Sequence, residues 1–268
     1  MRLTVDHVTR YRYDRPARLV VQSHRLWPSD FAGQRLVRWQ VTVEGGQKGA
    51  GFRDGAGDVV QGWTVAGPVD EVTVHVEGLV ETTDLSGVLR GHRETVPPEV
   101  YLRATAPTRT DTALVALAAT ARGDDALALA HALSGCVADA IAYRPGVTHA
   151  HTTAAEALSL GEGVCQDHAH ALIAVARARG LPGRYVSGYL FSDASGSAHE
   201  AAHAWAELYI AGLGWVGFDP ANRSCPDERY IRLGSGYDAQ DAAPIRGIAR
   251  GAGREEMDVT VAILQASQ

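Results

Sequence analysis

Lysine, cysteine and long apolar runs are scarce in this chain of 268 residues. Lys48 is its single lysine, and the formal net charge of −6 at pH 7 gives no argument for binding nucleic acid. Three cysteines cannot all pair, which argues against a disulfide framework. No run approaches the roughly 18 apolar residues of a membrane span, and the start lacks the features of a signal peptide. We therefore expect no nucleic-acid or membrane partner and a cytoplasmic location, where a free thiolate survives.

The first eighty or so residues alternate apolar and polar side chains with the period of a β-strand. The stretches 3–13, 37–44 and 71–76 carry this pattern. One-sided strands of this kind are typical of antiparallel sheets with a solvated face. The pattern breaks at Pro97-Pro98, so the sequence predicts a β-rich N-terminal domain over 1–95 and a second domain over 96–268.

The second domain opens with helical periodicity over 112–121 and 125–143. Asp124 or Asp125 is the expected N-cap of the second helix, and Thr152 or Thr153 caps a short third helix over 154–160. A last alternating stretch, 257–263, is expected to close a sheet.

The stretch from Gly161 to His170 reads Gly-Glu-Gly-Val-Cys-Gln-Asp-His-Ala-His and continues into an alanine-rich apolar run. Two glycines give a permissive backbone just before Cys165, and Gly180 and Pro182 end the run. Cys165 is therefore expected in the first turn of a buried helix. There the unpaired N–H groups and the helix dipole stabilise a thiolate, which benefits a nucleophile and not a structural cysteine.

Residues 202–210 and 215–220 alternate as two strands joined by a glycine turn. If a three-residue loop over 210–212, or a longer loop on the same centre, closes this hairpin, His203 lies directly opposite Asp219, with Cβ atoms about 5 Å apart. A cysteine, a histidine and an orienting acid in this arrangement are the nucleophile, base and orienter of cysteine acyl transfer.

Three motifs resemble those of the transglutaminase-like superfamily: Gly-Val-Cys-Gln-Asp at 163–167, His-Ala-Trp at 203–205, and Gly-Trp-Val-Gly-Phe-Asp-Pro at 214–220. The opening Thr-Arg-Tyr-Arg-Tyr-Asp-Arg-Pro at 9–16 is similar to the start of its bacterial branch, which has a β-rich N-terminal region. The resemblance implies an α+β fold. In it, a β-rich N-terminal region precedes a papain-like transglutaminase core whose helix-borne cysteine packs on an antiparallel sheet.

The resemblance also implies a catalytic triad of Cys165, His203 and Asp219. One departure is visible, because His168 stands where relatives usually carry an aromatic residue. His168 is spaced i, i+3 from Cys165, and three roles are compatible with that position. It is either a cation that stabilises the thiolate, or a zinc ligand, or a core residue whose ring is hydrogen-bonded to a backbone carbonyl. The sequence leaves these three alternatives open.

Further residues are expected to line the site. Gln166 donates to the reacting oxygen through its side chain or, as the better candidate, through its backbone N–H together with that of Cys165. Tyr189 and Trp205 are expected to form walls, and the loop 192–200 borders the site as a candidate gate.

A rival interpretation gathers five residues around zinc: Cys165, His168, His170, His199 and His203. Structural zinc normally has four protein ligands at characteristic spacings, and those spacings are missing here. We therefore expect no metal and no cofactor.

The expected activity is acyl transfer or hydrolysis on peptide or protein amides through a thioester. A primary amine as acceptor defines a transglutaminase, whereas water defines a protease or amidase, and the sequence does not decide between them. The single lysine is explained more simply by a GC-rich genome than by selection for a surface poor in acceptor amines. The alternative from another class is a binding or scaffold protein with a vestigial triad.

Overall fold

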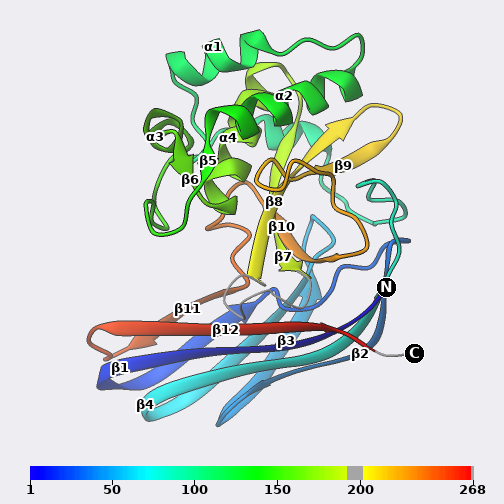
Figure 1. Ribbon diagram of the computed structural model, residues 1–268. Helices are drawn as coiled ribbons and strands as arrows, with labels where there is room; N and C mark the ends of the chain where they lie inside the picture. Colours follow the sequence, from blue (N-terminus) through cyan, green and yellow to red (C-terminus); the bar gives the residue numbers. More distant parts are fainter. Residues whose placement is uncertain (192–201, 267–268) are drawn as a thin grey trace.

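The structure, a computed structural model, describes residues 1–191 and 202–266. Figure 1 shows a unit of helices and a small sheet above a broad β structure built from much longer strands. No helix in the described ranges is long and apolar enough to cross a membrane. The elements follow in chain order: β1 (Arg2–His24), β2 (Gln34–Val43), β3 (Gly46–Arg53), β4 (Val59–Thr82), η1 (Pro98–Leu102), α1 (Thr112–Thr120), α2 (Ala126–Ala140), β5 (Ala142–Tyr143), α3 (Ala154–Leu160), β6 (Glu162–Gly163), α4 (Cys165–Ala178), β7 (Gly183–Leu190), β8 (Ala202–Ile210), β9 (Gly214–Phe218), β10 (Tyr230–Gly236), β11 (Ile245–Arg250) and β12 (Glu255–Gln265).

The long strands β1 and β4 form the centre of an antiparallel sheet with the order β11-β1-β4-β2. Strand β12 also pairs with β1, and β3 also pairs with β4. Register shifts between Arg12 and Leu19 divide β1, so that its first part pairs with β12 and its second part with β11. The predicted alternation is confirmed in the first part, where Leu3, Val5 and Tyr11 are buried.

The end of the described chain returns to this first sheet. The predicted strand at 257–263 lies within β12, and its partner is β1 of the N-terminal region. The expected division into 1–95 and 96–268 therefore does not coincide with the sheet boundaries. The physical reason is that the edge of β1 presents unpaired N–H and C=O groups, which any later extended segment can satisfy.

A second antiparallel sheet, with the order β10-β7-β8-β9, packs against α4. Helices α1, α2 and α3 also pack on α4, so every residue from Asp167 to Ala176 is buried. A helix covered on several sides reads as a continuous apolar run. Leu172 and Ile173 share their core cluster with Leu208 of β8, which places α4 in the centre of the upper unit.

The helix starts were predicted closely. The Asp125 carboxylate accepts the N–H of Ala128 at 2.7 Å, and this capping bond begins α2. Thr153 and Glu156 form a reciprocal capping box at the start of α3. Asp125 and Thr153 are thus the caps among the alternatives that the sequence offered.

Some side chains of the second sheet enter the apolar core of the first sheet. Tyr189 of β7 and Ile231 and Leu233 of β10 pack into the cluster formed by β1, β4 and β12. The far end of β7 lies beside the N-terminal sheet (Figure 1). The upper unit therefore rests on the N-terminal sheet through buried side chains.

Buried ion pairs run beside this core. Arg232 of β10 binds Asp58 at 2.7 Å and Glu207 of β8 at 2.8 Å. Arg184 of β7 binds the same Glu207 at 2.7 Å and Glu94 at 2.5 Å. Burial alone would raise the pKa of Glu207, but the two arginines outweigh it and hold that pKa low. Asp58 and Glu94 thus supply acidic partners from outside the second sheet.

Candidate active site

Cys165 is the first residue of α4, as predicted, and is half-buried. The chain reaches it through Gly161, whose φ of 70° ends α3 in the left-handed region. The Asp167 carboxylate then accepts the N–H of Val164 at 2.9 Å and the hydroxyl of Thr148 at 2.6 Å. An acidic side chain in the first turn matches the helix dipole, and the bond to the N–H of Val164 makes Asp167 a capping residue of α4.

His203 lies near the start of β8, and its Nε2 is 2.6 Å from Oδ2 of Asp219. Burial lowers the pKa of His203, but hydrogen bonds to Asp219 and to Cys165, together with their charges, outweigh burial and raise the pKa to about 10. Because Asp219 occupies Nε2, Nδ1 is the ring nitrogen left for proton exchange with the thiol. The structure therefore brings Cys165, His203 and Asp219 together.

Asp219 is fully buried and follows β9 directly. Its Oδ2 also accepts hydrogen bonds from the Tyr230 hydroxyl and from Asn222 Nδ2, each at 2.8 Å. Burial raises the pKa of Asp219, but the bond and charge of His203 and the bonds from Asn222 and Tyr230 lower it below its usual value. Asp219 is thus held as a carboxylate.

Asn222 and Tyr230 were absent from the residues predicted for the site. Asn222 also lies 3.3 Å from Nε2 of His203. A signal for Asn222 existed, because a turn after Asp219-Pro220 returns the third residue toward the carboxylate. Tyr230 comes from the next strand, β10, and no local pattern links it to Asp219.

Trp205 packs against His203, as expected of a residue that lines the site. The rings of Trp205 and His203 stack with centroids 6.4 Å apart, and the ring of Tyr230 meets the Trp205 ring edge-on at 5.5 Å. Gln166 turns its side chain to the carbonyl of Ala150 at 3.3 Å, so its backbone N–H remains the better donor to a reacting oxygen.

The expectation that Tyr189 lines the site is wrong. Its side chain is buried in the core of the N-terminal sheet, and its hydroxyl lies 2.7 Å from Nδ1 of His7. The reason is the position of its strand, since the end of β7 passes beside the N-terminal sheet (Figure 1). The loop 192–200, the candidate gate, lies outside the described residues.

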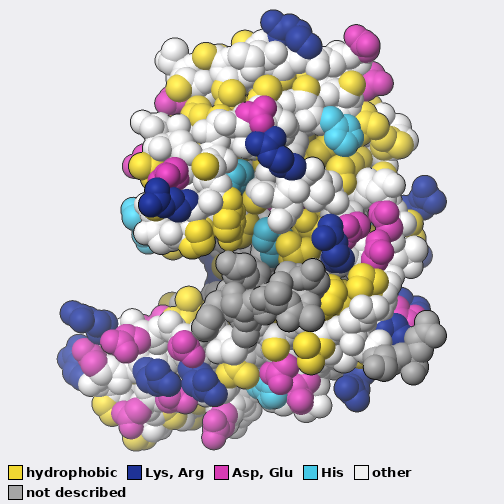
Figure 2. Space-filling model, viewed as in Figure 1, with side chains coloured by type: hydrophobic (Ala, Val, Ile, Leu, Met, Phe, Trp, Pro, Cys, Tyr) yellow, Lys and Arg dark blue, Asp and Glu magenta, His cyan; other side chains and the backbone are white. Residues whose placement is uncertain are grey.

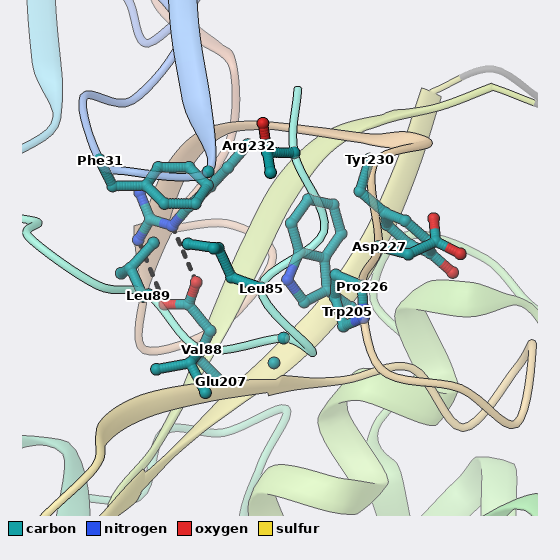
Figure 3. Close-up of a pocket in the computed structure, with 14 residues that line it drawn as sticks. Phe31, Leu85, Val88, Leu89, Trp205, Glu207, Pro226, Asp227, Tyr230 and Arg232 are labelled. Atoms are coloured by element: carbon teal, nitrogen blue, oxygen red, sulfur yellow. Dashed lines mark hydrogen bonds and ion pairs between the residues drawn. The ribbon is translucent and has the colours of Figure 1, made fainter. Parts of the chain in front are cut away.

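A small cavity opens behind Trp205, between the second sheet and the segment before the first helices (Figure 3). Trp205 and Tyr230 line one side, with the Glu207–Arg232 ion pair among the other lining groups. Its volume of about 40 Å³ holds a few water molecules and not a peptide side chain. This cavity is therefore a feature of the packing behind the histidine and not a substrate site.

The zinc interpretation finds no support in the described part of the chain, where no group of three metal-binding side chains occurs. Nε2 of His170 accepts the N–H of Ala239 at 3.0 Å. Both ring nitrogens of His168 face backbone carbonyls. His199 lies outside the described residues.

The fold is that of a papain-like α+β protein whose cysteine begins a buried helix packed on an antiparallel sheet. The family model of the transglutaminase-like superfamily matches residues 114–220, and that of the bacterial transglutaminase-like N-terminal region matches 3–81. This chain belongs to the transglutaminase-like superfamily and has the N-terminal region of its bacterial branch. At that level it is a member of the cysteine-based hydrolases and transferases.

One relative matches nearly the whole chain, and another matches less than half of it. An uncharacterized protein of Mycobacterium leprae is 31% identical over 98% of both chains. An uncharacterized protein of Mycobacterium tuberculosis is 43% identical over 40% of this chain and 37% of its own length. Among solved structures, a candidate cysteine protease from Cytophaga hutchinsonii superposes with a TM-score of 0.75. It is 21% identical, and the match covers 100% of this chain and 92% of that one, which supports the fold.

Proposed function

We propose that the protein is a cysteine acyl transferase or hydrolase that acts on peptide or protein amides through a thioester. The observation that carries the proposal is the pair of His203 and Asp219, with Nε2 of His203 2.6 Å from the carboxylate, beside Cys165, whose proximity helps to raise the pKa of His203. A buried carboxylate that fixes the imidazole leaves its other nitrogen to exchange a proton with the thiol.

The first half of the reaction forms the thioester. Nδ1 of His203 takes the thiol proton, and the Cys165 thiolate attacks the amide carbonyl carbon. The N–H groups of Cys165 and Gln166 lie at the start of α4, where no intrahelical acceptor exists, and they stabilise the oxyanion. The C–N bond then breaks, and His203 gives its proton to the leaving amine.

The second half returns the free enzyme. A primary amine or water loses a proton to His203 and attacks the thioester carbonyl. The C–S bond breaks, and Cys165 recovers its proton from the imidazolium. Amine as acceptor gives transamidation, and water gives hydrolysis. No step needs a metal or cofactor.

We also propose a reducing, cytoplasmic location. All three cysteines are free, and a reducing compartment keeps the Cys165 thiol available.

The decisive experiment incubates the protein with a proteome and a tagged primary amine. Mass spectrometry then compares the amount of incorporated amine, the product of transamidation, with the amount of new N-termini and deamidated side chains, the products of hydrolysis. Wild type and Cys136→Ser should give equal signals, and Cys165→Ala should give none. Equal signals from wild type and Cys165→Ala would overturn the proposal in favour of a binding or scaffold role.

A further inference from the structure

His168 makes two hydrogen bonds that one neutral imidazole cannot make. The ring is 2% exposed, with Nδ1 2.9 Å from the carbonyl oxygen of Val164 and Nε2 2.8 Å from that of Ile141. A carbonyl oxygen only accepts hydrogen bonds, so each nitrogen must donate. Neutral imidazole has one N–H, whereas imidazolium has two. We infer that His168 is held as a buried imidazolium and that it is a positioning residue for Cys165.

The neutral ring is disfavoured by its surroundings. With one N–H, the other nitrogen would turn a lone pair toward a carbonyl lone pair in a site that water does not reach. An unsatisfied buried polar atom of that kind costs the full desolvation of the group. The charged ring gives both of its nitrogens an acceptor, although the Val164 carbonyl already accepts the N–H groups of Asp167 and His168 at 3.0 and 3.1 Å.

The charge is also placed well with respect to the helices. Ile141 is the C-cap of α2, and the carbonyl end of a helix favours a cation. On α4, the ionisable neighbours are Cys165 and Asp167, whose carboxylate is fixed by Val164 and Thr148. From β5, the Tyr143 ring lies 6.3 Å from the imidazole between centroids. The carbonyl end of α2 therefore favours the positive charge on His168.

The two bonds join the start of α4 to the end of α2. Val164 is the N-cap of α4, immediately before Cys165, and Ile141 leads into β5. His168 therefore fixes the turn that carries the thiol and adds positive charge one helical turn from it. This role rests on the proposed function, in which Cys165 is the nucleophile, but the charge of His168 does not depend on it.

The first test measures the charge without activity. Nitrogen-15 NMR of histidine-labelled protein at pH 7 should show two protonated ring nitrogens for His168, assigned by their loss in His168→Gln. The Cys165→Ala protein should show the same signals. A single protonated nitrogen on His168 would overturn the inference, whatever the protein does to amides.

The second test measures the effect on the thiol. Iodoacetamide alkylation of Cys165 is followed by mass spectrometry from pH 5 to 9 in wild type, His168→Gln and His168→Phe. Loss of the cation should slow alkylation at pH 6 by roughly tenfold, the scale on which a neighbouring charge shifts an ionisation equilibrium, and the rates should converge at high pH. The control is His75→Gln on β4, which should follow wild type.

The outcomes separate the two claims. Unchanged pH profiles in both His168 variants would overturn the positioning role, even with two protonated nitrogens. A merely structural role would lower the unfolding midpoint of these variants and leave the alkylation profile in place. Failure of the proposed function alone would show as normal His168 spectra and alkylation profiles with no amide turnover.

Discussion

Asp219 and His203 meet although they are not opposite each other in their hairpin. The register pairs Ile210 with Gly214 and Ala206 with Phe218, and its continuation places Asp219 opposite Trp205. The carboxylate nevertheless lies 2.6 Å from Nε2 of His203. A shift of two residues keeps both side chains on one face of the sheet, and a diagonal pair of that kind remains within reach.

Asp219→Asn should keep the fold and reduce turnover on amides by about 10²- to 10⁴-fold. The asparagine side chain is uncharged and can present an N–H donor to His203 where the Asp219 carboxylate accepted a hydrogen bond. The imidazole therefore loses both its orientation and its counter-charge. Steady-state kinetics would show the loss in kcat, with circular dichroism confirming the fold. The matched control is Asp227→Asn, whose carboxylate pairs with exposed Arg229. Similar kcat values in the two variants would contradict an orienting role for Asp219.

Tyr230→Phe should reduce kcat by about tenfold and leave KM nearly unchanged. The hydroxyl gives Asp219 one of its three side-chain hydrogen bonds, while the ring packing on Trp205 survives the change. Hydrogen bonds to charged groups are worth about 1.5–3 kcal/mol, and His203 and Asn222 still hold the carboxylate. Ser224→Ala removes a weaker contact of the same hydroxyl at 3.4 Å and serves as the control. An increase in KM alone would instead indicate a substrate contact.

Stability should fall as the pH rises from 6.5 to about 10. Burial lowers the pKa of His203, but its bonds to Asp219 and Cys165 raise that pKa from 6.5 to about 10. The folded protein therefore binds this proton more tightly than the unfolded chain. The resulting stabilisation is complete below pH 6.5 and is lost as the pH passes through the folded value.

Urea unfolding at pH 6, 8 and 10 measures this decline. Other groups titrate in the same range, so the quantity to compare is the difference between wild type and His203→Gln. The variant should show a flatter dependence, and His75→Gln should follow wild type. Parallel curves for wild type and His203→Gln would show that His203 is not the group responsible.

Local features of the sequence predicted the parts of the site that local geometry determines. Glycines before Cys165 and an apolar run after it predicted the start of α4. The residues next to a helix start determine where the helix begins, and its own apolar residues determine whether it is buried. The alternation around His203 predicted its hairpin. The predicted loop at 210–212 was wrong, since the three loop residues are 211–213 and every pair moves by two. Alternation along a strand shows which face of the sheet a side chain occupies, but not which residue of the neighbouring strand lies opposite it.

Contacts between distant segments were beyond such patterns. Tyr230 reaches Asp219 from β10, and Tyr189 turns to His7 on β1, 182 residues away in sequence. Alternation shows that a strand has a buried face but not which sheet covers it. For the same reason, the return of β12 to β1 could not be predicted from its own residues.

Asp58→Asn should lower the free energy of unfolding by about 3–5 kcal/mol. Asp58 is fully buried, and its carboxylate binds Arg232 at 2.7 Å and the N–H and hydroxyl of Ser235 at 2.6 and 2.8 Å. Once the charge of Asp58 is removed, the acidic partner that remains to Arg232 is Glu207, which also forms an ion pair with Arg184. Removal of one partner from a buried ion pair leaves an uncompensated charge, and this explains the size of the loss.

Urea denaturation of Asp58→Asn beside Asp6→Asn measures this loss. The Asp6 side chain is exposed and contacts His75, so its change should cost less than about 1 kcal/mol.

The same argument predicts that residues 96–268 alone do not fold, because they lack both Asp58 and Glu94 and leave Arg184 and Arg232 with one carboxylate between them. An Asp58→Asn protein as stable as Asp6→Asn, or a folded 96–268 fragment with a sharp unfolding transition, would show that the two sheets do not depend on these ion pairs.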